Sequence, residues 1–181
     1  MKPLIVNKQI RLEVIKYIHA FQIFQAIEQN REFLSKWLPF VEQTNTQGDT
    51  EEFIRSVLAE PVEFRENVFV IWFQDHFAGL IGFKDTDRLN MKTEIGYWLI
   101  EKMTGKGIMK KSAEALIQLV FMTMKMNRVQ IKCGVGNEKS AAIPKRLGFQ
   151  FEGIERAGEK HKHHFIDLEV YSLLKEEWGR R

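Results

Sequence analysis

Two glycines that directly precede an amphipathic segment are the residues of this sequence best placed to bind a ligand. Gly105 and Gly107 follow a stretch with strand character and open a segment with helical periodicity. The first turn of a helix presents free backbone N–H groups and the positive end of the helix dipole, and glycine lets an anion approach without an intervening Cβ. The same end carries additional positive charge, from Lys102, Lys106, Lys110 and Lys111. The pattern predicts a pyrophosphate-binding loop, with a ligand-free strand-to-helix turn as the alternative.

Two common nucleotide-binding motifs do not fit this loop. The dinucleotide fingerprint needs a third glycine at the position of Lys110. A P-loop needs a glycine at the position of Ile100 and a serine or threonine at the position of Gly107. Both motifs are therefore excluded.

The elements that must position this loop change in type along the chain. Apolar alternation and dense β-branched runs predict strands at 9–15, 68–73, 78–83, 93–100, 129–135, 149–155 and 166–174. Helical spacing predicts helices at about 18–36, from Asp49 onward, at 107–125 and at about 138–147, before a left-handed stop at Gly148. The charged residues 156–164 are expected to form a loop. The expected fold is α+β (mixed α/β), with one central, largely antiparallel sheet.

Individual residues in these elements carry further expectations. Asp49 and Glu52 resemble the capping box that starts a helix. Residues 74–76 are expected to form a hairpin turn. Apolar side chains expected to face the interior include Phe21, Phe24, Ile27 and Leu34 on the first helix, and Val129, Ile131, Cys133 and Val135 on the strand at 129–135.

Length and composition limit the classes of protein that remain. A chain of 181 residues is expected to form one domain over residues 1–181. Its net charge of +3 lacks the strong basic excess of dedicated nucleic-acid-binding domains, so no direct nucleic-acid role is expected. The single cysteine excludes an internal disulfide and a multi-cysteine zinc site. Because no apolar run approaches the ~18 residues of a membrane span and the N-terminus lacks a signal-peptide core, a cytoplasmic protein without a membrane role is expected.

The glycine loop and a second block of residues together resemble the GNAT acetyltransferases. Lys102, Gly105 and Gly107 are similar to the Gln/Arg-x-x-Gly-x-Gly/Ala loop of that family, with lysine where glutamine or arginine is commoner. The second block is an Asn-x-x-Ser turn and a Leu-Gly-Phe helix end, formed by Asn137, Ser140 and 147–149 and followed by Phe151-Glu152-Gly153. Trp37-Leu38-Pro39 and the long helical N-terminal segment resemble the RimJ/RimL-type branch, which acetylates ribosomal-protein N-termini. The resemblance spans essentially the whole chain.

This resemblance implies a GNAT-like sheet, flanked by helices, in which two middle strands splay apart and bind acetyl-CoA. On this sequence these are the strands at 93–100 and 129–135. Pyrophosphate is expected on the backbone amides of about 106–109, the pantetheine arm against the first strand and Asn137, and the nucleotide phosphate near Lys145 or Arg146. The implied cofactor-binding residues are Ile95, Tyr97, Trp98, Leu99, Lys102, Gly105, Lys106, Gly107, Ile108, Met109, Asn137, Lys145 and Arg146. No metal is implied.

The resemblance also implies two catalytic residues, each with a structural alternative. Ser140 would donate a proton or hydrogen bond to the leaving sulfur, or would simply cap the following helix. Glu159 would act as the base, through water, or would be a solvated loop residue. Trp37 is either a core anchor or a wall of the amine site. His161, His163 and His164 are expected to be part of a solvated basic loop rather than a metal site.

Amine chemistry favours a protein N-terminus as the acceptor. An α-amino group has a pKa of roughly 7.7–8.0, against about 10.4 for lysine, so a modest carboxylate base suffices. We expect acetyl transfer to the N-terminal α-amine of a ribosomal protein, in a ternary complex and by a homodimer or higher homo-oligomer. A small-molecule amine acetyltransferase and a non-catalytic CoA-binding module are the alternatives.

Overall fold

The strands pair into one sheet that is mostly antiparallel, as the sequence predicts. The computed structural model describes residues 2–59 and 66–179. The sheet order in this part of the chain is β1-β2-β3-β4-β5-β6-β8-β7. β5 and β6 pair in parallel, whereas the pairs β1–β2, β2–β3, β3–β4, β6–β8 and β7–β8 are antiparallel. The strands are β1 (Leu4–Ile5), β2 (Ile10–Val14), β3 (Val68–Phe73), β4 (His76–Asp87), β5 (Lys92–Leu99), β6 (Arg128–Gly134), β7 (Gln150–Lys160) and β8 (Phe165–Leu174).

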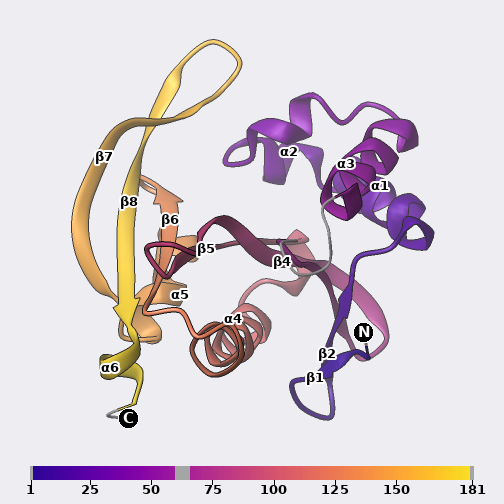
Figure 1. Ribbon diagram of the computed structural model, residues 1–181. Coiled ribbons are helices and arrows are strands. Elements are labelled where there is room, and N and C mark those ends of the chain that lie inside the picture. The colour runs from indigo at the N-terminus through magenta and orange to yellow at the C-terminus, as the bar shows by residue number, and fades with distance from the viewer. Residues whose placement is uncertain (1, 60–65, 180–181) are drawn as a thin grey trace. The chain divides into compact units, whose positions relative to one another are not determined.

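Helices lie in three of the connections, between β2 and β3, between β5 and β6, and between β6 and β7 (Figure 1). They are α1 (Ala20–Gln29), α2 (Arg31–Ser35), α3 (Gln47–Ala59), α4 (Ile108–Gln118), α5 (Glu138–Arg146) and α6 (Lys175–Trp178). Short 3₁₀ segments are Tyr17–His19, Pro39–Glu42 and Glu101–Met103, and Leu119–Thr123 forms a π-helical turn. The expected mixed α/β fold is confirmed. Over residues 2–59 and 66–179, no helix has both the length and the apolar character needed to cross a membrane.

The chain divides into two compact units. The first consists of Met1–Gly82 and Tyr97–Ile108, and the second of Phe83–Gly96 and Met109–Arg181. Strands β4 and β5 contribute residues to both units. The single domain expected over residues 1–181 stays a prediction.

In the first unit, α1 packs against α3 (Figure 1). Ile27 and Leu34 are buried as predicted, but Phe21 is 59% exposed, so the predicted apolar face is wrong at that position. The single helix predicted at 18–36 is also wrong, because α1 ends at Gln29. Asn30 explains the break: its side chain donates to the carbonyl of Ala26 (2.9 Å) and accepts from the backbone N–H of Glu101 (3.0 Å). An asparagine side chain that binds backbone in this way competes with helix continuation.

The start of α3 lies earlier than the sequence suggests. Asp49 does act in a capping box, but its partner is Thr46 rather than Glu52. The Asp49 carboxylate accepts from the backbone N–H of Thr46 (2.7 Å), and the N–H of Asp49 donates to the Thr46 hydroxyl (3.3 Å). The helix therefore begins at Gln47.

The predicted hairpin between β3 and β4 is confirmed, but its turn is shorter than the predicted 74–76, because His76 already belongs to β4. Gln74 and Asp75 both have positive φ, at 49° and 62°, and Phe73 pairs with His76 across a two-residue loop. Farther along β4, the β3–β4 register shifts between Ile71 and Trp72. Gly79 lies at this irregularity, against the backbone of β5: an added Cβ would collide with the carbonyl oxygen of Trp98 and lie 2.8 Å from the Leu99 Cα. The close approach of β4 to β5 thus requires glycine.

In the second unit, β6 and β7 differ from the sequence expectations at their ends. Val129, Ile131 and Cys133 are buried as predicted, whereas Val135 lies beyond β6 and is 48% exposed. β7 continues to Lys160, so the loop predicted at 156–164 is wrong except for its last four residues, 161–164. The β7–β8 register shifts twice, between 151 and 153 and between 155 and 159. These shifts break the period-2 pattern by which a strand is recognised in sequence.

The Phe-Glu-Gly motif at the start of β7 anchors this strand through its glutamate. Both carboxylate oxygens of Glu152 accept from the Arg128 guanidinium at 2.6 Å, and the Ser172 hydroxyl donates at 2.7 Å. The hydrogen bonds from Arg128 lower the pKa of Glu152 to about 2, against the opposing effect of burial. Glu152 therefore connects β7 to both β6 and β8.

We expect Gly79→Ala to lower the free energy of unfolding by about 2 kcal/mol or more, because the methyl group must displace β5 backbone. Gly96→Ala is the matched control, since its Cβ would lie 3.7 Å from the Lys84 side chain in ordinary contact. Urea unfolding measures both variants. Equal losses of stability in the two would contradict the close-approach explanation.

We expect the ion pair of Glu152 to make stability depend on pH in the acid range. A carboxyl whose pKa is depressed in the folded state stabilises it above the unfolded pKa of about 4.3, and this stabilisation is lost as the pH falls toward 2. Glu152→Gln should flatten the dependence of the unfolding midpoint on pH between about 5 and 2, whereas Glu114→Gln, an exposed change on α4, should not. A wild-type slope in Glu152→Gln would show that this pair does not cause it.

Candidate active site

The glycine loop has the backbone conformation that an anion-binding turn needs. Gly105 and Gly107 have φ of +75° and +73°, and a Cβ on either would find no atom within 4 Å. Glycine is thus required by the left-handed backbone and not by packing against the protein, which leaves space beside both residues. Before them, Thr104 closes the turn by donating its hydroxyl hydrogen to the carbonyl of Glu101 (2.8 Å). Lys102 and Lys106 are exposed on this loop, and the first amides of α4 follow it.

The two residues after the loop can contact a ligand through their backbone but not through their side chains. Ile108 and Met109 are only 1% and 5% exposed. Their side chains belong to the core, so a ligand at this turn could contact only their backbone; the expected phosphate contact of their amides stays a prediction. On β5, Ile95 and Trp98 are likewise buried, while Tyr97 and Leu99 are half-buried.

The pairing of β5 with β6 ends before β5 does. The parallel register joins Lys92–Glu94 to Arg128–Gln130. The backbone of Ile95 and Gly96 therefore follows the last residue of this register. A strand with free backbone groups can bind an extended ligand in the manner of an added strand.

A buried carboxylate lies at the point where this register ends. Glu94 is 1% exposed, and its oxygens contact Lys84 Nζ (2.7 Å), Gln130 Nε2 (2.9 Å) and Lys132 Nζ (3.9 Å). Burial alone would lower the pKa of Lys84, but the attraction of Glu94 outweighs it and raises this pKa. Glu94 is not among the site residues predicted from the sequence, although a carboxylate within an apolar strand signals a buried charge that needs partners.

The helix that follows the Asn-x-x-Ser turn is capped by the asparagine of this turn and not by its serine. Asn137 caps α5, since its side-chain oxygen accepts from the backbone N–H of Ser140 (3.2 Å). The alternative in which Ser140 is the cap is therefore wrong. The Ser140 hydroxyl lies 3.3 Å from the Cys133 thiol, which donates to it. Cys133 is 3% exposed, which confirms its expected place in the core.

The structure also shows where three further predicted site residues lie: Lys145, Arg146 and Trp37. Lys145 and Arg146 are exposed at the C-terminal end of α5, and Lys145 Nζ lies 5.7 Å from the centroid of the Tyr171 ring. Trp37 is half-buried after α2, and its backbone N–H donates to the Leu34 carbonyl (3.1 Å). Their contacts with nucleotide and amine stay predictions.

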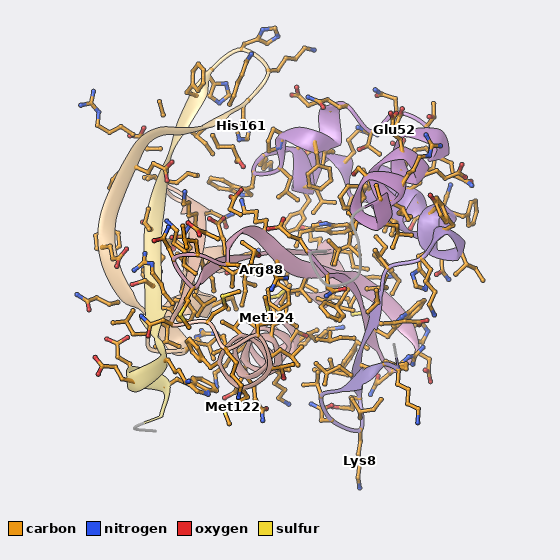
Figure 2. All side chains as sticks on the ribbon, viewed as in Figure 1. Lys8, Glu52, Arg88, Met122, Met124 and His161 are labelled. Carbon is orange, nitrogen blue, oxygen red and sulfur yellow. The ribbon has the colours of Figure 1, made fainter. Side chains whose placement is uncertain are left out.

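Glu159 lies on β7, beside a histidine that was expected to be solvated. The Glu159 side chain is 33% exposed, and its Oε2 lies 3.3 Å from Nε2 of His161. The His161 side chain is only 8% exposed, so the solvated-loop expectation is wrong for this residue, although His163 and His164 are exposed. Figure 2 labels His161 on the β7–β8 hairpin. In residues 2–59 and 66–179, no group of three His, Cys, Asp or Glu residues is arranged to hold a metal.

We expect Gly107→Ala to weaken binding of coenzyme A roughly tenfold, because an L-residue at this φ is strained and its methyl group takes space needed by phosphate. Isothermal titration calorimetry with coenzyme A measures the dissociation constant. Gly48→Ala is the control, because its Cβ would meet only the Thr46 hydroxyl at 3.4 Å. Unchanged affinity in Gly107→Ala would exclude this loop as the phosphate site.

Comparisons with known proteins agree with these features. The model of the acetyltransferase (GNAT) domain matches residues 10–150. The chain is 36% identical over 177 residues to "Putative ribosomal N-acetyltransferase YdaF" of Bacillus subtilis (strain 168), covering 96% of this chain and 95% of that protein. It is 28% identical over 169 residues to the ribosomal-protein-serine acetyltransferase of Escherichia coli (strain K12), covering 93% and 94%. The crystal structure of the Microcin C7 self immunity acetyltransferase MccE in complex with acetyl-CoA and AMP is similar with a TM-score of 0.89 and 29% identity, covering 93% and 94%.

The family match and the structure lead to the same assignment. The matched residues, 10–150, include the glycine loop and the Asn137–Ser140 turn. The loop has the open left-handed glycines that a pyrophosphate site requires, and a solved relative binds acetyl-CoA. The chain therefore belongs to the GNAT family and is an acetyl-CoA-dependent N-acetyltransferase.

Proposed function

We propose that this enzyme acetylates the N-terminal α-amine of a ribosomal protein by direct transfer from acetyl-CoA. The observation that carries the proposal is the Glu159 carboxylate, which is partly exposed and held by a neighbouring imidazole. Such a carboxylate suits an α-amine, whose pKa of roughly 7.7–8.0 lies well below the 10.4 of lysine. The two curated relatives with ribosomal names, each matched over more than nine-tenths of its length, support the same acceptor class.

In this mechanism Glu159 removes the proton of the α-ammonium group through a water molecule. The neutral nitrogen then attacks the thioester carbonyl carbon, a C–N bond forms, and the C–S bond breaks. As the amide forms, the nitrogen releases its second proton to solvent. The Ser140 hydroxyl donates to the departing thiolate of coenzyme A. General acid and base groups of this kind each contribute about 10²–10⁴-fold to the rate.

In this proposal acetyl-CoA is bound mainly by backbone groups, and positively charged side chains add attraction for its phosphates. The amides of 106–109 bind the pyrophosphate, with Lys102 and Lys106 adding positive charge. The backbone of β5 and Asn137 bind the pantetheine arm, and Lys145 or Arg146 meets the nucleotide phosphate. Trp37 forms a wall of the amine site. The enzyme works as a cytoplasmic homodimer or higher homo-oligomer in this proposal.

A small-molecule amine is the second candidate acceptor. The similarity to the Microcin C7 self immunity acetyltransferase, at 29% identity over most of both chains, favours this alternative. The two functions share the fold and the donor, so the acceptor itself has to be determined.

Incubation of the protein with acetyl-CoA and a mixture of ribosomal proteins, followed by mass spectrometry of N-terminal peptides, tests the proposal. We expect acetylation of one N-terminus, reduced about 10²-fold or more by Glu159→Gln and less by Ser140→Ala. Glu155→Gln, on the same strand and paired with Lys132, is the control and should keep wild-type activity.

Three outcomes would count against parts of this proposal. Acetylation that survives both catalytic substitutions would overturn the assigned residues but retain the enzyme class. Transfer to a small amine alone would identify the second acceptor class. Binding of acetyl-CoA without transfer to any amine would indicate a non-catalytic module.

A further inference from the structure

The turn between β7 and β8 contains one histidine whose environment differs from that of its neighbours. Four residues, 161–164, join Lys160 to Phe165, which pair with each other at the end of the two strands. Lys162, His163 and His164 are exposed, whereas the His161 side chain is 8% exposed. A polar ring is buried at the tip of a charged hairpin only where a partner compensates its loss of water.

Two contacts fix the position of His161. Its backbone N–H donates to the carbonyl of His164 (2.8 Å), which closes the turn. Its ring stacks on the ring of His164, with centroids 5.4 Å apart and an interplanar angle of 29°. The imidazole is thereby oriented before any substrate binds.

The remaining polar contact of this ring is directed at Glu159. Nε2 of His161 lies 3.3 Å from Oε2 of Glu159. A neutral imidazole with its hydrogen on Nε2 donates to this oxygen, so it restrains the carboxylate and leaves Oε1 to meet water or an amine. The hydrogen bond to Oε2 thus orients the Glu159 carboxylate, while Oε1 can accept a proton.

A lysine also interacts electrostatically with Glu159. Lys84 on β4 is bound to buried Glu94 at 2.7 Å, and the charge of Glu159 contributes to the raised pKa of Lys84. The polar surroundings of Glu159 therefore include Lys84 on β4 as well as the imidazole of His161.

We propose that His161 is a positioning residue for Glu159: its imidazole holds the carboxylate in place for proton removal. This rests on the proposed role of Glu159. The proposal makes His161 a determinant of kcat, but not of acetyl-CoA binding.

Two substitutions separate orientation of the carboxylate from packing in the turn. His161→Gln keeps an N–H donor, whereas His161→Leu removes the donor and keeps an apolar side chain. Steady-state rates with acetyl-CoA and a synthetic peptide with an N-terminal serine give kcat and KM at pH 8 to 9. His163→Leu, an exposed change in the same turn, is the matched control, and thermal melting checks that each variant is folded.

We expect kcat of His161→Leu to fall roughly tenfold with the KM for acetyl-CoA unchanged, and His161→Gln to stay within about threefold of wild type above pH 8. Imidazole ¹⁵N NMR spectra of the wild type at pH 8 should show the hydrogen of His161 on Nε2, and Glu159→Gln should alter that signal. The NMR measurement does not depend on turnover.

The results distinguish this proposal from the one on which it rests. Wild-type kcat in both His161 variants, together with an inactive Glu159→Gln, would overturn only the role of His161. An equal fall of kcat in His161→Leu and His161→Gln would show that the N–H donor is not needed and that the role of His161 is merely structural. Full activity of Glu159→Gln would overturn the roles of Glu159 and His161 together.

Discussion

The pairing of buried Glu94 is the interaction on which the second unit depends most. A carboxylate that is 1% exposed has lost its water and must be compensated by charge and hydrogen bonds. Here the compensation comes from Lys84 on β4 and from Gln130 and Lys132 on β6. Because Lys132 also pairs with Glu155 at 2.7 Å, the same set of charges extends to β7. One buried charge therefore makes four strands dependent on each other's register.

The proposed phosphate site in the glycine loop depends on backbone conformation more than on specific side chains. Ile108 and Met109 are buried in the core, while the backbone they carry begins α4. The left-handed φ values of Gly105 and Gly107 direct the chain into that helix and leave open space beside it. Phosphate recognition by amides and a helix dipole needs only this geometry. Side-chain identity at such a loop is accordingly less restricted than backbone conformation, as the lysine at position 102 illustrates.

The irregular pairing of β7 sets the position of the proposed base, Glu159. The register shift between Glu155 and Glu159 coincides with positive φ at Ala157, whose N–H donates to the Asp167 carboxylate at 2.7 Å. A bulge turns side chains relative to a regular strand and is common beside active sites. Glu159 follows the bulge, and His161 follows two residues later at the end of the strand pairing. The features that make this segment difficult to recognise as a strand also decide which way its carboxylate is presented.

The sequence alone determined what depends on local chemistry. The turn at Gln74 and Asp75, the stop at Gly148, the glycine loop and the apolar strands follow from the conformational freedom of a few residues and from periodicity, and the structure confirms them. The tertiary structure decided what depends on distant partners. Asn30 ends α1 while accepting from Glu101, β7 continues as a strand because β8 pairs with it, and Arg128 holds Glu152 from another strand. The burial of His161 also depends on a contact formed in the folded chain. A charged segment predicts solvent exposure, and His161 is buried because Glu159 on β7 compensates its loss of water.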